Sequence, residues 1–274
     1  MEEWKKLMDC RTIVVKTGSS TLTFPNGRLN YHRLMRLAET MSAIQRSGKK
    51  LILVSSGAIA VGSGRMGINS KPADLADKQA LAAIGQAELI RIYRRFFDYN
   101  CQKVAQVLLT KDIVINHERR VNASNTLAEL LKMDIIPIVN ENDTVATDEI
   151  EFGDNDTLSS YVAELAGADL LVLLSDIDGL FTADPTKDQY AKLIRVVNRL
   201  TEDMEKSAAG SSTGFGTGGM AAKIAAARIC RSADIKVVIA NGSRPGILSD
   251  ILQGNEAGTL FTWDRDPVKS ARPG

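Results

Sequence analysis

The most constraining feature of this chain is a regular alternation between short apolar runs and longer amphipathic stretches. Runs of five or six residues rich in Val, Ile and Leu are typical of buried parallel strands, which helices connect by right-handed crossovers. The sequence therefore predicts an α/β fold with an open, mostly parallel central sheet and helices on both faces. The expected strands cover 12–16, 51–55, 104–109, 135–139, 170–174 and 236–240, and the expected helices cover 31–47, 74–98, 123–133, 154–166, 220–233 and 246–253.

Chain length allows one large domain or two lobes that share a sheet, since 274 residues can bury a full core. The one candidate boundary is Gly167-Ala168-Asp169, and no linker rich in Pro, Gly or Ser marks it. We therefore expect two lobes on one continuous sheet, over about 11–167 and about 168–262. Residues 263–274 are expected to form a surface tail. The segment 210–219 contains five glycines and is typical of a loop that a ligand orders.

Composition excludes several classes of partner. The 34 Lys and Arg residues nearly balance the 33 Asp and Glu residues, which does not favour binding to nucleic acid or to an acidic membrane. No apolar run approaches the roughly 20 residues of a membrane span, and the charged start lacks a signal peptide's apolar stretch. Three widely spaced cysteines and two histidines offer neither a disulfide framework nor a zinc site. We therefore expect a cytoplasmic protein that binds no nucleic acid and no membrane, with Cys230 in the core.

Residues 140–156 are rich in carboxylates and amides, and they directly follow the apolar strand at 135–139. Seven Asp and Glu residues and no Lys or Arg fall within this window. Ligands bind beyond the carboxyl ends of strands in open α/β sheets, so the position favours a ligand site. The alternative interpretation is an acidic hairpin exposed to solvent.

Charge divides this acidic stretch into three parts. Seven carboxylates cannot all line one phosphate site, because like charges in a low dielectric repel strongly. Asp148, Glu149 and Glu151 are therefore predicted to lie on a solvated rim, and Asp154 or Asn155 can cap the following helix. Candidates remain for a substrate ammonium group, a metal–phosphate complex or nearby lysines, namely Asp143 and Asp156, and for neutral amide contacts, namely Asn140, Asn142 and Asn155.

Three turns that contain glycine follow predicted strands or open predicted helices, at 16–20, 55–58 and 217–223. Each offers bare backbone N–H groups to an anion, and two of them add a lysine, Lys16 or Lys223. Either lysine taken alone is more simply explained as a solvated side chain. The two together suit a polyphosphate that is held from two sides.

Two common nucleotide-binding patterns are missing from the sequence. The chain contains no G-x-x-x-x-G-K-[ST] motif. Gly62-Ser63-Gly64 lies several residues beyond its strand, which is too far for a dinucleotide-binding turn. Spacing alone therefore predicts a phosphoryl transferase without a P-loop that acts on a small charged substrate.

The same segments resemble the amino-acid kinase family and, within it, the glutamate 5-kinases. The resemblance runs in family order from residue 12 to about 262, which is nearly the whole chain. Lys-x-Gly and Ser-Ser-Gly occur across the family, whereas Asn-Glu-Asn-Asp followed by Gly-Asp-Asn-Asp is much more specific. The matching segments are 14–20, 54–60, 139–147, 153–156, 174–185 and 216–223.

This resemblance implies an N-terminal lobe that binds L-glutamate and a C-terminal lobe that binds ATP. Lys16 and Lys223 would stabilise the transferred phosphoryl group, and Asp156 would orient both lysines. Carried over by position, the residues that hold glutamate would be Ser56, Gly57, Asn140, Glu141, Asp143 and Asn155. Those that contact the nucleotide would be Lys16, Ser175, Asp176, Thr217, Gly218, Gly219, Met220, Ala221, Ala222 and Lys223.

The implied reaction is ATP-dependent phosphorylation of the γ-carboxylate of L-glutamate, the first step toward proline. A carboxylate with an ordinary pKa of about 4.3 is ionised at neutral pH and needs no general base, which agrees with the lack of a candidate catalytic histidine. Mg²⁺ would be bound mainly through the ATP phosphates, with no protein ligand assigned. Family members are usually inhibited by L-proline and form dimers or tetramers, and the resemblance extends both expectations to this chain.

Rival functions stay open at this point. The nearest is another kinase of the same family, acting on acetylglutamate, aspartate or UMP, and a second is a catalytically silent nucleotide- or proline-binding sensor. The sequence departs from the family pattern at Ala222, where Thr is frequent, and at Phe181, where Tyr is frequent. Many members also carry a PUA domain, which resembles RNA-binding modules, and the expected form here is the short one without it.

Overall fold

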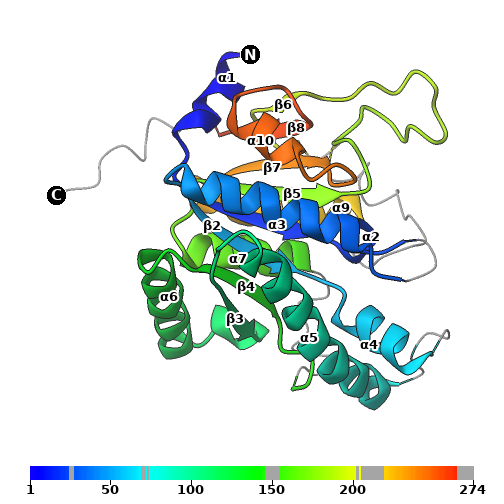
Figure 1. Cartoon of the computed structure of the whole chain (residues 1–274). Coiled ribbons are helices and arrows are strands. Elements are labelled where there is room, and N and C mark those ends of the chain that lie inside the picture. The colour runs from blue at the N-terminus through cyan, green and yellow to red at the C-terminus, as the bar shows by residue number, and fades with distance from the viewer. Residues whose placement is uncertain are drawn as a thin grey trace.

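The computed structural model describes residues 1–24, 28–68, 72, 74–145, 155–201, 204 and 219–263. Within them one eight-stranded sheet runs through the molecule in the order β3-β4-β2-β1-β5-β7-β8-β6 (Figure 1). Neighbouring strands are parallel except β7 and β8, which are antiparallel. The strands are β1 (Thr12–Thr17), β2 (Lys50–Ser55), β3 (Val104–Leu109), β4 (Ile136–Glu141), β5 (Leu170–Ser175), β6 (Val196–Val197), β7 (Lys236–Asn241) and β8 (Thr259–Phe261).

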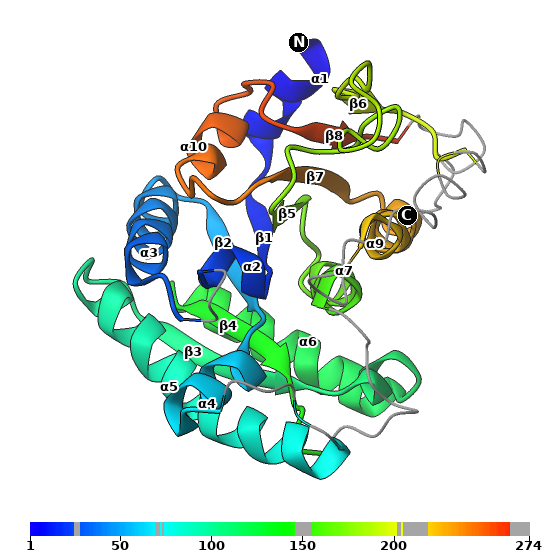
Figure 2. The same ribbon diagram turned by 90° about the vertical axis from the view of Figure 1, so that its right-hand side faces the viewer.

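Helices cover both faces of this sheet. They are α1 (Glu2–Lys5), α2 (Ser19–Leu22), α3 (Tyr31–Arg46), α4 (Ala58–Met66), α5 (Leu75–Asp98), α6 (His117–Lys132), α7 (Asn155–Leu165), α9 (Met220–Ser232) and α10 (Ile247–Leu252), with 3₁₀ turns η1 (Lys6–Asp9) and η2 (Lys111–Val114). One core lies between the sheet and α1, α3, α5 and α10, and a second lies between the sheet and α6, α7 and α9. Figure 2 shows α3 and α10 on one side of the sheet and α7 and α9 on the other.

Side chains of the central strands alternate between the two cores. Ile13 and Val15 of β1 belong to the core on the α3 side, and Val14 between them belongs to the core on the α7 side. This period of two follows from the pleat of a strand. Because both faces are covered, the strands are apolar along most of their length. Lys16 continues the alternation toward the α7 side, where its charge meets a carboxylate.

The predicted fold class is confirmed, and the six predicted strands occur within two residues of their expected bounds. The sequence missed β6 and β8, which contain two and three residues. Runs this short have no readable hydrophobic period, although they extend the sheet beyond β7. Helix α6 begins at His117 rather than at 123, because the Asn116 side chain accepts a hydrogen bond from the backbone N–H of Arg119 (3.0 Å) and caps the helix there.

Several expectations about segments have different outcomes. The expected tail starts with a packed residue, since the indole N–H of Trp263 donates to the Ile235 carbonyl oxygen (2.7 Å). Residues 264–274 and the glycine-rich segment at 210–218 lie outside the described residues. The division into two lobes stays a prediction. In the described part of the chain, no helix is long and apolar enough to cross a membrane.

Candidate active site

Most of the predicted site residues lie at one edge of the sheet, where the parallel strands β1, β2, β3, β4, β5 and β7 end. Because these strands are parallel, their carboxyl ends all face the same way. Strand β1 lies between β2 and β5; α3 links β1 to β2 across one face, whereas α7 links β4 to β5 across the other. Open α/β proteins bind ligands beyond the carboxyl ends at such a reversal.

A buried ion triad occupies this edge. The ammonium Nζ of Lys16, near the end of β1, lies 2.6 Å from Oδ1 of Asp156 in the first turn of α7. The Nζ of Lys223, in the first turn of α9, lies 3.1 Å from Oδ2 of the same carboxylate. Lys16 is 6% exposed, Lys223 5% and Asp156 0%. One carboxylate therefore holds two ammonium groups, one on each of its oxygens.

The two lysines determine the direction of the pKa shift of Asp156. Burial by itself raises the pKa of the Asp156 carboxyl, but the charges of Lys16 and Lys223 and their hydrogen bonds outweigh burial, so the pKa lies below its ordinary value. Two positive charges and one negative charge leave a local excess of one positive charge. A buried positive excess is a site for an anion, because bringing in a negative group compensates the desolvated charge.

A chain of amide groups lies beside the triad. The Nδ2 of Asn155 donates to the carbonyl oxygen of Ser55 (2.7 Å) and to Oδ1 of Asn140 (2.9 Å). The same Asn140 oxygen accepts the backbone N–H of Glu141 (2.9 Å). The Nδ2 of Asn140 donates to Oε1 of Gln86 in α5 (2.7 Å). The amides thus connect β2, β4, α5 and α7 at the carboxyl edge.

The predicted residues Ser56 and Gly57 form the turn between β2 and α4. The backbone N–H of Ser56 donates to the carbonyl oxygen of Thr17 (3.2 Å), which joins the ends of β2 and β1. Gly57 has φ 99°, a left-handed conformation that favours glycine, and it precedes the first turn of α4. Beneath the turn, the buried Ser55 hydroxyl contacts the Tyr93 hydroxyl (2.9 Å), and burial raises the pKa of Tyr93 to about 12.

Asp143 and Glu141 extend the site past the end of β4. Glu141 is the last residue of the strand and is buried, and Asp143 is half-buried in the turn that follows. Thr144 and Val145 are already exposed. The solvated rim predicted for 148–151 and the cap predicted at Asp154 lie outside the described residues. Asn155, the other capping candidate, is the first residue of α7 and directs its amide N–H groups to Ser55 and Asn140.

The predicted nucleotide residues lie at the ends of β5 and α9. The hydroxyl of Ser175 donates to Oδ1 of Asp176 (3.0 Å) just beyond β5. Gly219 precedes α9, and Met220, Ala221 and Ala222 form its first turn together with Lys223. Thr217 and Gly218 lie outside the described residues.

Three residues at this edge escaped sequence reasoning. Gln86 is a polar residue inside the long helical pattern of α5, where no local signal separates it from surface positions. Tyr93 lies on the apolar face of α5 between Leu89 and Phe97, which indicates burial but no role at the site. Asn241 ends β7, and its Nδ2 donates to Oδ1 of Asp178 (2.8 Å). A polar residue at the carboxyl end of a predicted parallel strand could have indicated Asn241.

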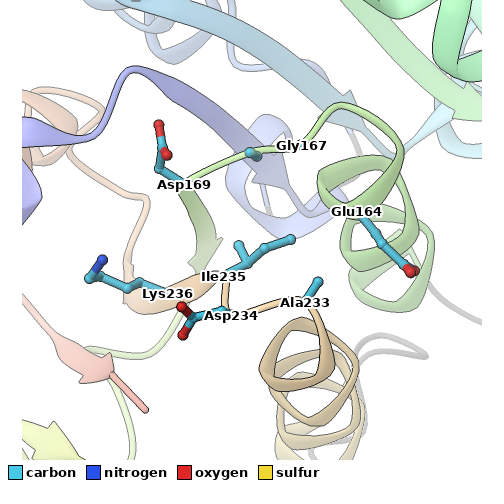
Figure 3. Close-up of a pocket in the computed structure, with 8 residues that line it drawn as sticks. Glu164, Gly167, Asp169, Ala233, Asp234, Ile235 and Lys236 are labelled. Carbon is cyan, nitrogen blue, oxygen red and sulfur yellow. The ribbon is translucent and has the colours of Figure 1, made fainter. Parts of the chain in front are cut away.

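A hollow of about 390 Å³ lies at the opposite edge of the sheet, at the amino ends of β5 and β7. Figure 3 shows Glu164, Asp169, Asp234 and Lys236 around it. The Asp169 carboxylate accepts the backbone N–H groups of Arg11 (2.7 Å) and Thr12 (2.9 Å), so it fastens the start of β1. The hollow is lined by helix-to-strand turns and lies away from the triad, and we do not assign it a ligand.

The acidic side chains that the structure describes at this edge are not clustered as metal ligands. Within the described residues, no group of three or more His, Cys, Asp or Glu side chains could hold a metal ion. The one buried carboxylate of the triad, Asp156, already faces two ammonium groups.

Known sequences are similar to this chain over most of its length. The profile of the amino acid kinase family matches residues 11–241. The glutamate 5-kinase of Enterococcus faecalis is 46% identical over 260 residues, which cover 93% of this chain and 96% of that protein. The glutamate 5-kinase of Listeria welshimeri is 46% identical over 272 residues, covering 98% of this chain and 99% of that protein.

Solved structures with lower identity share the fold. UMP kinase from Bacillus anthracis has a TM-score of 0.62 at 19% identity, over 92% of this chain and 96% of that chain. Isopentenyl phosphate kinase from T. acidophilum has a TM-score of 0.61 at 16% identity, over 91% and 99%. Since the family profile and the curated relatives cover most of the sequence, this chain belongs to the amino acid kinase family and groups with its glutamate 5-kinases.

Proposed function

We propose that this protein transfers the γ-phosphoryl group of ATP to the γ-carboxylate of L-glutamate, the first step of proline synthesis. The observation that carries the proposal is the buried Lys16–Asp156–Lys223 triad at the carboxyl edge of the sheet. The 46% identity to glutamate 5-kinases over 93% of the chain supports the choice of substrate.

In this proposal the triad stabilises negative charge and transfers no proton. The attacking carboxylate and the phosphates of ATP are all negative, so their approach is opposed by repulsion. Lys16 and Lys223 place two ammonium groups in a water-poor site, where they stabilise the charge on the transferred group. Asp156 fixes both ammonium groups before substrates bind, which keeps reorganisation small. The three residues therefore lower the barrier by electrostatic preorganisation.

The reaction needs no general base. A γ-carboxylate oxygen forms the new P–O bond while the bond between the γ-phosphorus and the bridging oxygen of ADP breaks. The products are γ-glutamyl phosphate and ADP, and no proton has to be removed from the nucleophile, because a carboxyl of pKa about 4.3 is already ionised at neutral pH. His32 and His117 are both exposed, in keeping with this chemistry.

Glutamate is held by the β2 and β4 ends in this proposal. Ser56 and Gly57 offer a hydroxyl and backbone N–H groups at the start of α4, where the helix dipole favours a carboxylate. Glu141, Asp143 and Asn155 provide acceptors for the α-ammonium group. Asn140 lies beside them and holds the Asn155 amide in place (2.9 Å). Holding the substrate close to the triad converts the transfer into an effectively intramolecular step.

ATP is held from the β5 and α9 ends in this proposal. Ser175 and Asp176 contact the nucleoside part, and the segment from Thr217 to Lys223 binds the phosphates. Mg²⁺ enters as part of the nucleotide substrate, coordinated by phosphate oxygens.

Regulation, assembly and location follow the family expectation in this proposal. L-Proline carries the same α-carboxylate and a related α-ammonium group, so it competes for the glutamate site as a feedback inhibitor. The protein is a cytoplasmic homo-oligomer, a dimer or a tetramer. A proline titration of the glutamate kinetics and molar mass by light scattering test the two main parts of this proposal.

A substrate panel tests the function. ADP release is measured with ATP and Mg²⁺ in the presence of L-glutamate, acetylglutamate, L-aspartate or UMP. We expect turnover with L-glutamate to exceed that with every other acceptor. Turnover with UMP or acetylglutamate alone would identify a different kinase of this family. ATP binding without turnover on any acceptor would support the silent sensor instead.

A further inference from the structure

Gln86 is a residue of α5 that reaches the candidate glutamate site from the α3 side of the sheet. It is half-buried, and its Oε1 accepts a hydrogen bond from Nδ2 of Asn140 (2.7 Å), 54 residues away in sequence. Helix α5 packs in the core on the α3 side, whereas Asn155 begins α7 in the other core. The path Gln86–Asn140–Asn155 therefore crosses from one helix layer to the other over the carboxyl edge.

Two backbone groups fix the orientation of the amides in this path. The carbonyl oxygen of Ser55 can only accept, so the NH₂ side of Asn155 must face it. The N–H of Glu141 can only donate, so the oxygen side of Asn140 must face it. Neither amide can rotate by 180° without setting like groups against each other.

The hydrogen bonds of the two asparagines define the contribution of Gln86. Both N–H groups of Asn155 are used, by Ser55 and by Asn140, and the Asn140 oxygen accepts twice. The NH₂ group of the buried Asn140 still requires an acceptor, and Gln86 supplies it. In the described part of the chain, the Asn155 oxygen has no partner, so the path leaves it as an acceptor at its end.

Close backbone packing of α5 against α4 holds Gln86 next to the site. A Cβ atom on its neighbour Gly85 would lie 1.7 Å from the carbonyl oxygen of Ala58, in the first turn of α4. Helix α5 is therefore in direct backbone contact with the helix that begins at Gly57. The same turn of α5 thus sets the position of Gln86 and of the Ser56–Gly57 turn.

We propose that Gln86 is a positioning residue for glutamate: it fixes the Asn140 carboxamide, which fixes Asn155 against the end of β2. Gln86 acts through Asn140 and has no contact of its own with the reacting atoms. This inference rests on the proposed function, since it concerns the same amino-acid site. Loss of the Gln86 oxygen should loosen substrate binding and leave the phosphoryl-transfer machinery intact.

The first test is the substitution Gln86→Met, which keeps length and removes the strong acceptor. We expect the KM for L-glutamate to rise about 3- to 10-fold, the effect of one lost hydrogen bond, with kcat and the KM for ATP within about 2-fold of wild type. The matched control is Ala87→Met, which adds the same side chain at the next, exposed position of α5. The control should leave all three constants unchanged.

A second test asks whether Gln86 acts through Asn140. In an Asn140→Ala background, adding Gln86→Met should change the KM for glutamate by less than about 2-fold, because the shared partner is already gone. Thermal melts check that each variant folds. If Asn140→Ala does not fold, Asn155→Ala removes the next link and serves as the background, where the effect of Gln86→Met should again be reduced.

Three results would overturn the positioning role: an unchanged KM in Gln86→Met, a loss of kcat without a change in KM, or a full additive effect in both backgrounds. They are separable from failure of the proposed function, which the wild-type protein alone reports. Wild-type protein without glutamate-dependent ADP release would refute both proposals. Wild-type turnover with an unaffected Gln86→Met variant would refute only the positioning role.

Discussion

At the scale of single residues, the molecule places three charged side chains in its interior, where burial of a charge costs free energy. Asp156, Lys16 and Lys223 are almost fully buried, and each has lost most of its hydration. An ion pair in such a place contributes little to stability, because the loss of hydration offsets the attraction. The net positive charge of this triad therefore indicates a role in function rather than in stability.

Replacing Lys223 with Ala tests whether this lysine stabilises the transferred phosphoryl group. We expect kcat to fall by at least ~100-fold, because loss of one preorganised charge-stabilising group has that effect in enzymes of known mechanism. Steady-state kinetics with glutamate and ATP provide the measurement. Lys236→Ala, at the opposite edge of the sheet, is the control and should retain activity. A near-normal kcat in Lys223→Ala would remove this lysine from the mechanism.

Replacing Asp156 with Asn tests how much this carboxylate contributes to the free energy of unfolding. The two lysines lose their counter-charge, so we expect a loss of about 3–5 kcal/mol in the free energy of unfolding at neutral pH. Thermal and denaturant unfolding of wild type and variant measure it. An equally stable variant would show that solvent reaches the lysines.

The same comparison has a predicted pH dependence. The folded-state pKa of Asp156 lies below the unfolded value of about 3.9, so the unfolded chain binds more protons between the two values. The stability that this carboxylate provides is therefore fully present above about pH 4 and is lost as pH falls through the folded pKa. The difference in melting temperature between wild type and Asp156→Asn should narrow in that acid window.

At the scale of elements, a close helix crossing holds the start of α4 in place. A Cβ on Gly62 of α4 would lie 2.0 Å from the Leu81 carbonyl oxygen in α5, and one on Gly85 of α5 would lie 1.7 Å from the Ala58 carbonyl oxygen. Glycine at both positions lets the two backbones touch. The sequence fragment Gly62-Ser63-Gly64, considered as part of a dinucleotide site, is thus a packing feature at its first residue.

Two glycines of α4 give a matched test of this crossing. Gly62→Ala should destabilise the protein by more than 1 kcal/mol, because its new methyl group meets backbone that cannot move aside. Gly64→Ala places the same methyl group in open space on the same helix, and should stabilise by up to about 1 kcal/mol through helix propensity. Denaturant unfolding measures both. Equal effects of the two substitutions would contradict the close crossing.

At the scale of the whole molecule, both proposed substrate sites lie along a single sheet. Strand β1 pairs with β2 on one side and with β5 on the other, so the proposed lobes share a central strand. The core on the α3 side also contains residues from both, such as Leu34 and Leu248. Separation of the lobes would expose this common apolar surface to water.

Ligand-linked unfolding tests whether the lobes behave as one unit. We expect one cooperative thermal transition, which L-glutamate and MgATP each shift upward when added separately. At 100 times its dissociation constant a ligand stabilises by about 2.7 kcal/mol, or roughly 5–10 °C for a chain of this size. Scanning calorimetry gives the measurement. Two transitions, each shifted by one ligand only, would contradict the shared-sheet arrangement.

Much of the fold and part of the site could be predicted because their signals are local. Strand β5 appears in the sequence as Leu-Leu-Val-Leu-Leu, and the Asp74 cap and Asp98 end of α5 match the predicted bounds. Lys16 and Asn140 could be singled out because Lys16 ends a predicted strand and Asn140 directly follows one. Gln86 could not, because a glutamine in a helix has the same local pattern whether it meets solvent or a buried amide.

The sequence by itself determined the alternation of strands and helices, the fold class and the set of polar residues at the strand ends, since hydrophobic period and turn chemistry act between near neighbours. The residue pattern left both Asp143 and Asp156 open as partners of the lysines, and the family resemblance named Asp156. Only the tertiary structure gives the contacts of Asp156 with both lysines and the amides that connect across the sheet. Asp156 and Lys223 are 67 residues apart, and Gln86 and Asn140 are 54 apart. Contacts over such separations depend on the register and stacking of whole elements, which no local pattern encodes.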